Sequence, residues 1–563
     1  MPLPSSATIR RTLRAAALVC AGTLSWSGSP PPDYIPLNGL PMTSLTSIEA
    51  PADLPNVTVD ASTRSIRVGV ESRPARIVRG SQRLERVVRV PLGGARLELA
   101  LAPIRRTATF RVVADDVELR HVKVVPGIWT PIRVDLPASL SSQHIVEELI
   151  TSPEGLVAWS DDRLVRKWPA RSRPDVIVIS LDTVRPDYLS PYNPKEATPA
   201  LAAFTKEATR FDQAISVSSW TLPAHESIFT GAYPSIDGGR IDSREPTLAE
   251  TFADAGYDTF GASGGPFTDS AFGFQRGFAS YRDSVPGKHA SETTTWALDR
   301  MAQASQATPL FVFLNYFDAH EPSTGYTLAD WRAMDSRAFR WTTDAVDHLR
   351  AAYRHDVASL DREVGRLLDG IRRKRDWDNT IVVIFGDHGQ LLGERGMIGH
   401  SLRLDEELIH VPLLVKPAGD RRLPSHYVDQ VQLTDVFPLA LELAGIPTEQ
   451  ASSELDRIAR GEPIRALTFA QVRHPASPGL LDSSQWQSES LRLVRTDTVR
   501  AERDAEGHLM LTAIGDSGRL LDSAPMPSLF HELDLFEQGS KPEGPLRVRR
   551  DVLKQLRSLG YIR

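Results

Sequence analysis

Thr221 carries a hydroxyl group at the start of a short helical pattern, directly after a polar loop. Residues 219–225 read SWTLPAH, and the pattern is stopped by Gly231 and Pro234. A hydroxyl at a helix N-terminus faces unpaired backbone N–H groups and the positive end of the helix dipole. This position suits an attacking alkoxide and the anionic ester that it attacks. Taken alone, Thr221 is better explained as a helix N-cap, a position that Thr favours. Residues elsewhere in the chain must therefore show whether Thr221 is a nucleophile.

Three apolar runs of the chain end in carboxylate or imidazole groups. Runs this apolar and β-branched are typical of central strands in a parallel sheet that is covered by helices on both faces. Ligands of open α/β sheets bind beyond the carboxyl ends of the strands. A single Asp after a strand is usually a turn or cap residue, but three such strand ends predict one shared site. The runs are residues 175–181, followed by Asp182; residues 310–317, followed by Asp318 and His320; and residues 380–386, followed by Asp387 and His388.

Five motifs of this chain resemble those of the sulfatase family, which belongs to the alkaline phosphatase superfamily, and they occur in the family's order. The resemblance runs from about Pro174 to the C-terminus, and the combination is specific although no single motif would be. It implies an α/β fold in which a mixed, mostly parallel sheet is sandwiched by helices. The motifs are residues 182–187 (DTVRPD), 221–225 (TLPAH), 317–322 (FDAHEP), 386–389 (GDHG) and 399–400 (GH).

The resemblance also implies roles for individual residues. It places a divalent metal ion on Asp182, Asp387 and His388, with Thr221 beside it as the nucleophile. Carboxylates and a neutral imidazole are ordinary metal ligands, and a cation would neutralise the ester and lower the nucleophile's pKa. His320 and His400 match positions that contact the anionic head of the substrate or protonate the leaving oxygen, as an imidazole can do near neutral pH.

The chain departs from the sulfatase pattern at four positions. Sulfatases carry Cys or Ser, oxidised to formylglycine, where this chain has Thr221, so no formylglycine is expected. His225 replaces the Arg of that motif, which removes a bidentate clamp, and we assign His225 to catalysis and substrate binding in its place. Thr183 replaces the second acid of an Asp-Asp pair, and His388 stands where calcium-dependent sulfatases often have Asn. Fewer carboxylates and an added imidazole favour Mn²⁺ or Zn²⁺ over Ca²⁺, which stays an option.

These departures resemble the phosphodiesterase and phosphoglycerol-transferase branches of the superfamily. We therefore expect a hydrolase of a phosphate mono- or diester, carried on a small molecule, glycan or lipid. One alternative is a true sulfatase that works without formylglycine, and another is a non-catalytic, carbohydrate-binding relative. A single metal ion is favoured, although Asp318, His320 and His400 have the right ligand types to hold a second one.

The composition argues against nucleic-acid binding, and the N-terminus indicates where the protein is located. The 563 residues are 41% hydrophobic and 24% charged, which is ordinary for a globular protein. The net charge of −6 gives no electrostatic case for binding nucleic acid. Residues 1–30 resemble an export signal, with arginines before an apolar run, and predict a periplasmic or extracellular protein. Cys20, the single cysteine, would be removed with that signal or lipid-modified.

The rest of the chain divides into four predicted parts. Residues 31–47 form a Pro/Ser linker, and residues 48–168 show the short alternating strands of a β-sandwich that resembles carbohydrate-binding jelly rolls. Such a sandwich could contact carbohydrate, with Trp129, Trp159 and Trp168 as candidates, although core packing is the commoner use of a strand Trp. Residues 173–450 form the catalytic part. Residues 451–563 form a small antiparallel α+β subdomain with a strand expected at 530–536 and a helix from Val548.

Overall fold

The computed structural model describes most of the chain from residue 34 to residue 539. The described ranges are 34–36, 57–60, 65–90, 94–136, 142–166, 173–234, 241, 245–285, 287, 289–336, 339–401, 403–447, 454–473, 490–504, 506–514 and 527–539. The predicted export signal and the helix expected from Val548 lie outside them. Within the described part, we find no helix with the length and apolarity needed to cross a membrane.

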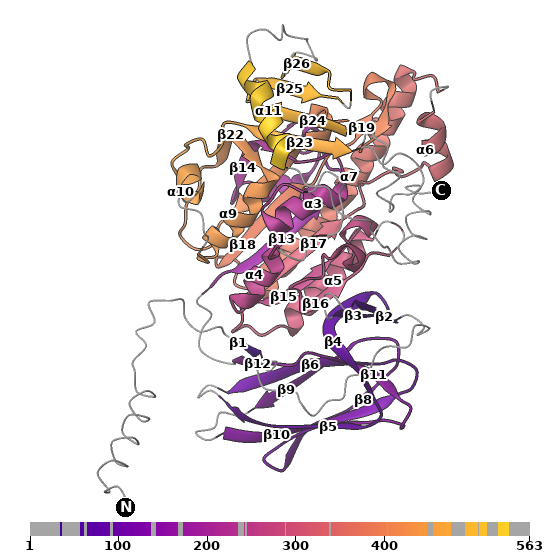
Figure 1. The fold of residues 1–563 in the computed structure, drawn as a ribbon, viewed down its shortest axis with the longest axis vertical. Helices are drawn as coiled ribbons and strands as arrows, with labels where there is room; N and C mark the ends of the chain where they lie inside the picture. The colour runs from indigo at the N-terminus through magenta and orange to yellow at the C-terminus, as the bar shows by residue number, and fades with distance from the viewer. Residues whose placement is uncertain are drawn as a thin grey trace, which may run out of the picture. The chain divides into compact units, whose positions relative to one another are not determined.

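A mostly parallel sheet forms the centre of the catalytic part (Figure 1). β13 is hydrogen-bonded in parallel to β17 on one side and to β18 on the other. β21 runs antiparallel between β18 and β14. This mixed α/β architecture confirms the predicted fold class. In spatial order the strands are β16 (Ser280–Arg282), β15 (Asp258–Ala262), β17 (Leu310–Tyr316), β13 (Asp175–Leu181), β18 (Thr380–Gly386), β21 (His410–Lys416), β14 (Thr209–Ile215) and β22 (His426–Gln432).

Helices cover both faces of this sheet because its strands are apolar on both faces. In β13, Val176 and Val178 belong to one core cluster, whereas Ile177 and Ile179 belong to the other. The first cluster contains side chains of α3 (Thr221–Thr230), α4 (Leu248–Asp254) and α9 (Val436–Leu443). The second contains side chains of α2 (Pro199–Phe204), α5 (Ala290–Gln303) and α7 (Thr343–Lys374). Shorter elements are α6 (Leu328–Met334), α8 (Glu406–Ile409), α10 (Glu454–Ala459), β19 (Leu391–Leu392), β20 (Ile398–Gly399) and the 3-10 turns η2 (Pro186–Tyr188), η3 (Pro266–Thr268), η4 (Ser270–Phe272), η5 (Glu394–Gly396) and η6 (Leu433–Asp435).

The strands before residue 167 pair antiparallel and enclose their own core. Phe110 and Trp159 meet edge to face there, with ring centroids 5.3 Å apart. Trp159 is fully buried and Trp129 is 7% exposed, so both pack inside the protein, while Trp168 lies outside the described residues. The strands are β1 (Tyr34–Pro36), β2 (Val57–Asp60), β3 (Ser65–Val68), β4 (Glu71–Arg79), β5 (Gln82–Arg89), β6 (Ala95–Pro103), β7 (Ala108–Ala114), β8 (Val117–Val124), β9 (Thr130–Leu136), β10 (Ser142–Ile150), β11 (Leu156–Ser160) and β12 (Arg163–Arg166).

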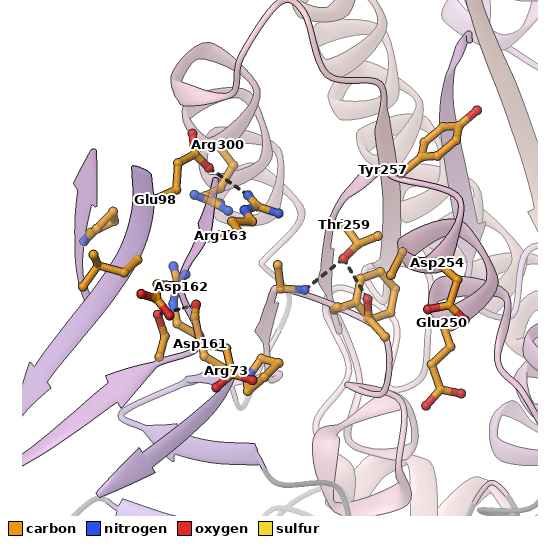
Figure 2. Close-up of a pocket in the computed structure, with 18 of the residues that line it drawn as sticks. Arg73, Glu98, Asp161, Asp162, Arg163, Glu250, Asp254, Tyr257, Thr259 and Arg300 are labelled. Atoms are coloured by element: carbon orange, nitrogen blue, oxygen red, sulfur yellow. Dashed lines mark hydrogen bonds and ion pairs between the residues drawn. The ribbon is translucent and has the colours of Figure 1, made fainter. Parts of the chain in front are cut away.

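β4 joins these strands to the catalytic sheet, because it pairs with β11 and also with β16. Arg163 of β12 and Asp258 of β15 form an ion pair of 2.6 Å across the same junction. A cavity of about 490 Å³ lies beside this ion pair and is lined by side chains of both parts (Figure 2).

The C-terminal part combines a four-stranded antiparallel sheet with α11 (Pro527–Gly539). The strand expected at 530–536 is wrong, because those residues belong to α11. Leu529 and Leu533, four residues apart on one helical face, bury together against the sheet. The strands are β23 (Thr468–Arg473), β24 (Ser490–Arg495), β25 (Val499–Arg503) and β26 (Leu509–Ala513).

Candidate active site

Three strand ends at the same level bring the acidic residues together. Leu181, the last residue of β13, pairs with Tyr316 of β17 and with Gly386 of β18. The residues that follow each strand therefore emerge at one edge of the sheet. Ligand-type atoms of Asp182, Asp387 and His388 lie within 4.8 Å of one another, and all three side chains are buried.

Thr183 holds the turn after β13 in an unusual backbone conformation. Its φ of 59° is in the left-handed region, which costs a non-glycine residue roughly 1–2 kcal/mol. The Thr183 N–H donates to Asp387 Oδ1 over 3.1 Å, and its carbonyl accepts from the Tyr353 hydroxyl of α7 over 2.7 Å. The Thr183 hydroxyl donates to the Asp182 carbonyl. The turn thus orients Asp387, while Thr183 provides a hydroxyl and no carboxylate at this position.

The electrostatics of Asp182 and Asp387 favour the binding of a cation between them. Burial and the charge of Asp387 raise the pKa of Asp182 well above its ordinary value, and burial also raises the pKa of Asp387. Asp182 Oδ1 and Asp387 Oδ2 are buried without a hydrogen-bond partner. Two unpartnered carboxylate oxygens in the interior are costly unless a ligand satisfies them.

His388 presents a neutral ring nitrogen to the same point. Burial lowers its pKa well below the ordinary value. Its Nδ1 lies 2.8 Å from the Gly389 carbonyl, which fixes the proton on Nδ1 and leaves Nε2 as an acceptor. Nε2 lies 3.4 Å from Asp387 Oδ2. Two carboxylates and one neutral imidazole are a donor set that fits Mn²⁺ or Zn²⁺.

Thr221 lies against this group and does not cap its helix. Trp220 occupies the N-cap position of α3, and Thr221 is the first helical residue. The Thr221 hydroxyl is 3.2 Å from His388 Nε2, and the residue is 1% exposed. The hydroxyl therefore stands both at a helix N-terminus and beside the candidate metal ligands.

His225 is enclosed beneath the site. Its Nδ1 donates to the Thr221 carbonyl over 2.8 Å, and its Nε2 accepts from the Ser180 hydroxyl over 2.8 Å. The rings of Phe274, Phe313 and Phe385 surround it, and burial lowers its pKa. Because both nitrogens are engaged inside the protein, this geometry favours anchoring the nucleophile over the predicted contact with substrate.

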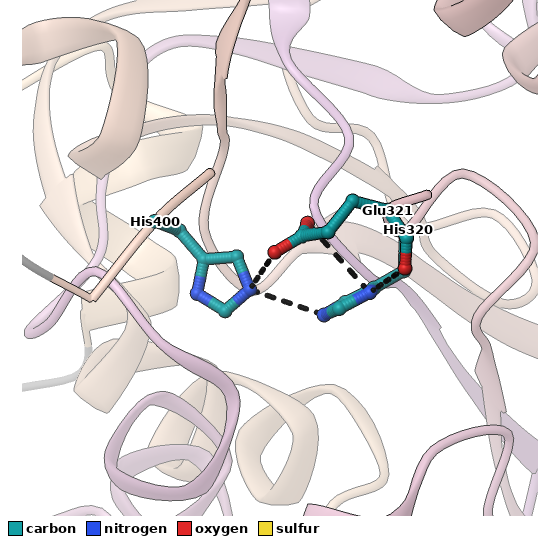
Figure 3. Close-up of side chains that lie close together, drawn as sticks. All are labelled: His320, Glu321 and His400. Carbon is teal, nitrogen blue, oxygen red and sulfur yellow. Dashed lines mark hydrogen bonds and ion pairs between the residues drawn. The ribbon is translucent and has the colours of Figure 1, made fainter. Parts of the chain in front are cut away.

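His320 and His400 meet at the edge of the same region, together with a residue that the sequence did not single out. Their Nε2 atoms are 3.1 Å apart, and His400 Nε2 lies 3.2 Å from Glu321 Oε1 (Figure 3). The rings of His400 and His388 have centroids 4.5 Å apart, which connects this cluster to the carboxylate group. Glu321 stands in the FDAHEP motif, but its place there gave no signal of the contact.

The pKa values of the two histidines are shifted in opposite directions. Burial lowers the pKa of His320 to about 3. Burial would also lower the pKa of His400, but the carboxylate of Glu321 outweighs it and the pKa is raised. His400 is thereby suited to hold a proton and His320 to accept a hydrogen bond.

Asp318, expected beside these histidines, has a different position. Its carboxylate accepts a hydrogen bond of 2.9 Å from the Ala290 N–H at the start of α5. The group of potential ligand atoms contains His320, Glu321 and His400. A second ion held through Asp318 stays a prediction, and the geometry offers Glu321 as the carboxylate in its place.

Comparisons with known proteins agree with the fold and the motif order. The family model described as Sulfatase matches residues 174–446. The uncharacterized sulfatase YidJ of Escherichia coli is 22% identical over 395 residues, which cover 57% of this chain and 78% of that protein. An ulvan-active sulfatase of Formosa agariphila is 25% identical over 415 residues, covering 64% of this chain and 80% of its own.

Two solved structures share the fold at low sequence identity. The phosphonate monoester hydrolase of Silicibacter pomeroyi is 20% identical, with a TM-score of 0.52, over 65% of this chain and 94% of its own. A 2-O GAG sulfatase is 17% identical, with a TM-score of 0.52, over 65% of this chain and 92% of its own.

Proposed function

We propose that this chain, an ester hydrolase whose residues 174–446 match the Sulfatase family model, hydrolyses phosphate mono- or diesters with Thr221 as the nucleophile. One observation carries the proposal. The Thr221 hydroxyl lies 3.2 Å from His388 Nε2, next to the buried carboxylates of Asp182 and Asp387. One oxygen of each carboxylate has no hydrogen-bond partner. A hydroxyl that only capped a helix would not need such neighbours.

Asp182, Asp387 and His388 would hold one divalent cation, for which Mn²⁺ or Zn²⁺ is the best match. When bound, the ion supplies positive charge that lowers the pKa of a nearby hydroxyl and stabilises the oxyanion of the ester. The unpartnered Asp182 Oδ1 and Asp387 Oδ2 support this role.

The residues of the chain account for the remaining steps. Thr221 Oγ1 releases its hydroxyl proton to solvent and attacks phosphorus, the bond from phosphorus to the leaving oxygen breaks, and His400 gives its Nε2 proton to that oxygen. Glu321 keeps His400 protonated beforehand, and His320 holds the imidazole by accepting from it. Water then gives one proton back to His400 and attacks the phosphothreonine, the bond from phosphorus to Thr221 Oγ1 breaks, and Oγ1 takes up a proton from solvent. A monoester thereby yields phosphate and a diester yields a phosphate monoester.

The choice of phosphate over sulfate rests on the chemistry of the second step. Hydrolysis of a threonyl sulfate is slow, whereas formylglycine sulfatases eliminate sulfate from an aldehyde hydrate, a route that a threonine lacks. A sulfate ester is the second candidate, favoured by the names of relatives such as the ulvan-active sulfatase. A purely carbohydrate-binding protein is disfavoured, because it would have no use for two unpartnered buried carboxylates.

We further propose that the substrate is an anionic ester of a small molecule, glycan or lipid that the protein meets after export. The export-like sequence of residues 1–30 supports the proposal that the protein meets its substrate after export. The glycan option is supported by the activity named for the ulvan-active relative.

A panel of esters tests the proposal. Purified protein and the variants Thr221→Ala and Thr221→Ser are assayed with Mn²⁺ or Zn²⁺ against 4-nitrophenyl phosphate, bis-4-nitrophenyl phosphate, phenyl phosphonate ester and 4-nitrophenyl sulfate. We expect turnover of a phosphorus ester, a loss of at least about a thousandfold in Thr221→Ala, and partial activity in Thr221→Ser. Turnover of sulfate alone would overturn the phosphate assignment, and full activity in Thr221→Ala would remove Thr221 from the nucleophile role.

A further inference from the structure

The cavity beside β4 and β15 lies at the opposite edge of the sheet from Thr221. Its lining includes Thr259, the second residue of β15, and Ala279, just before β16. These positions mark the amino ends of strands that run parallel to β13 and β17. The candidate catalytic residues follow the carboxyl ends, so the cavity is a separate site. Its volume of about 490 Å³ is within the range of about 300–1,000 Å³ that is usual for small-molecule sites.

Arg300 gives this cavity a positive charge that makes no direct ion pair with a described carboxylate, although the charge of Asp258 lies near enough to interact with it. It lines the cavity, is 8% exposed, and its Nε is buried without a hydrogen-bond partner. Its guanidinium lies over the Phe260 ring, 5.4 Å from the centroid. In the described part of the chain, no ion pair to a carboxylate is found for Arg300, whereas the neighbouring Arg163 pairs with both Glu98 and Asp258. A buried guanidinium without a carboxylate partner is stabilised by an anionic ligand.

The other lining groups restrict what that ligand can be. Carboxylates of Glu250 and Asp254 lie on the wall formed by α4, as Figure 2 shows, and apolar surface comes from Leu99 and Ile132. Glu250 already pairs with Arg276 over 2.8 Å, whereas Asp254 is exposed. Carboxylates repel a polyanion but accept hydrogen bonds from hydroxyl groups, so Asp254 is the better placed acceptor. One anionic group, several hydroxyls and an apolar ring face are the features of an acidic sugar.

We propose that this cavity binds an acidic monosaccharide unit, with its carboxylate or sulfate on Arg300 and its hydroxyl groups on the acidic wall of α4. The site lies between the N-terminal sandwich and the catalytic sheet, so it would hold a sugar away from the chemistry of Thr221. It is independent of the phosphate assignment.

Binding measurements on the full-length protein test this proposal. Titration calorimetry is done in the Thr221→Ala background, so that no ligand is turned over, with glucuronate, N-acetylglucosamine 6-sulfate and neutral glucose. Arg300→Gln removes the cation, and Ala253→Phe fills the cavity from α4 without changing any charge. Arg362→Gln, an exposed arginine of α7, is the matched control, and thermal melting verifies that each variant is folded.

We expect at least one acidic sugar to bind, with affinity at least about tenfold weaker in Arg300→Gln and in Ala253→Phe and unchanged in Arg362→Gln. Binding of glucuronate alone identifies a uronate as the ligand, and binding of the sulfated sugar alone identifies a sulfated one. The proposal is overturned if neither acid binds, if glucose binds as well as the acids, or if Arg300→Gln binds like the parent protein.

Discussion

Replacing His225 by Phe separates an anchoring role from a role in substrate binding. The Phe ring keeps aromatic contacts with Phe274, Phe313 and Phe385, but it is larger than the imidazole and crowds a fully buried pocket. It cannot make the two hydrogen bonds of 2.8 Å to the Thr221 carbonyl and the Ser180 hydroxyl. The change therefore removes the polar contacts of the side chain, including the approach of Nδ1 to Asp387 Oδ2 over 3.5 Å, while it keeps an aromatic ring in place.

The size of the effect follows from those two hydrogen bonds. Each contributes about 1 kcal/mol net and the larger ring adds a packing cost, so His225→Phe should lower the free energy of unfolding by at least about 2 kcal/mol. Thr221 would also lose the contact that fixes its carbonyl, and a small displacement of a nucleophile costs roughly ten- to a hundredfold in kcat. KM should stay within about threefold, because both ring nitrogens are engaged by groups of the protein.

Urea unfolding and steady-state kinetics measure both effects on the same preparation. His410→Phe serves as the matched control, because His410 makes one hydrogen bond of 2.9 Å, to the Asp212 carbonyl, and should lose about 1 kcal/mol without a change in kcat. A rise in KM of tenfold or more with unchanged stability would refute the anchoring role and restore His225 as a substrate contact.

Three further changes test the electrostatics. Asp182→Asn should stabilise the metal-free protein, and the gain should grow as the pH rises from 4 to 8. The pKa of Asp182 is raised in the folded protein, so above the ordinary value of 3.8 the unfolded chain ionises first and folding becomes less favourable. Equal melting temperatures of the variant and the parent protein across that range would contradict this. Glu321→Gln should lower the pKa of His400 and move the high-pH limb of kcat/KM to lower pH, whereas an unmoved limb would exclude His400 as the proton donor. Asp175→Asn breaks a fully buried ion pair with Arg375 and should cost about 3–5 kcal/mol in urea unfolding, and a loss below 1 kcal/mol would show that the pair is unimportant.

Much of the central architecture could be predicted because its signals are local. The runs of β13, β17 and β18 are continuously apolar, which is typical of buried parallel strands. Their equal register then places Asp182, Asp387 and His388 together without further information. The C-terminal segment was misassigned because its similarity to a family strand outweighed a helical spacing, Leu529 to Leu533, that the sequence did contain.

The details of the site depend on side-chain direction, which spacing alone does not determine. Asp318 and Glu321 are three residues apart, yet Asp318 accepts from the start of α5 and Glu321 contacts His400. His225 has the residue type of a catalytic group, but its burial follows from three phenylalanines on distant elements. Such contacts depend on tertiary packing, so the sequence pattern could not reveal them.

The covalent intermediate is the most direct measurement of the central claim. Enzyme loaded with Mn²⁺ or Zn²⁺ is mixed with bis-4-nitrophenyl phosphate, quenched in acid within the first turnovers, digested and analysed by tandem mass spectrometry. We predict a 4-nitrophenylphosphoryl adduct on Thr221 in the peptide that spans residues 211–240, and no adduct in Thr221→Ala. Rapid turnover without any adduct, or an adduct on another residue, would contradict the assignment of Thr221 as the nucleophile.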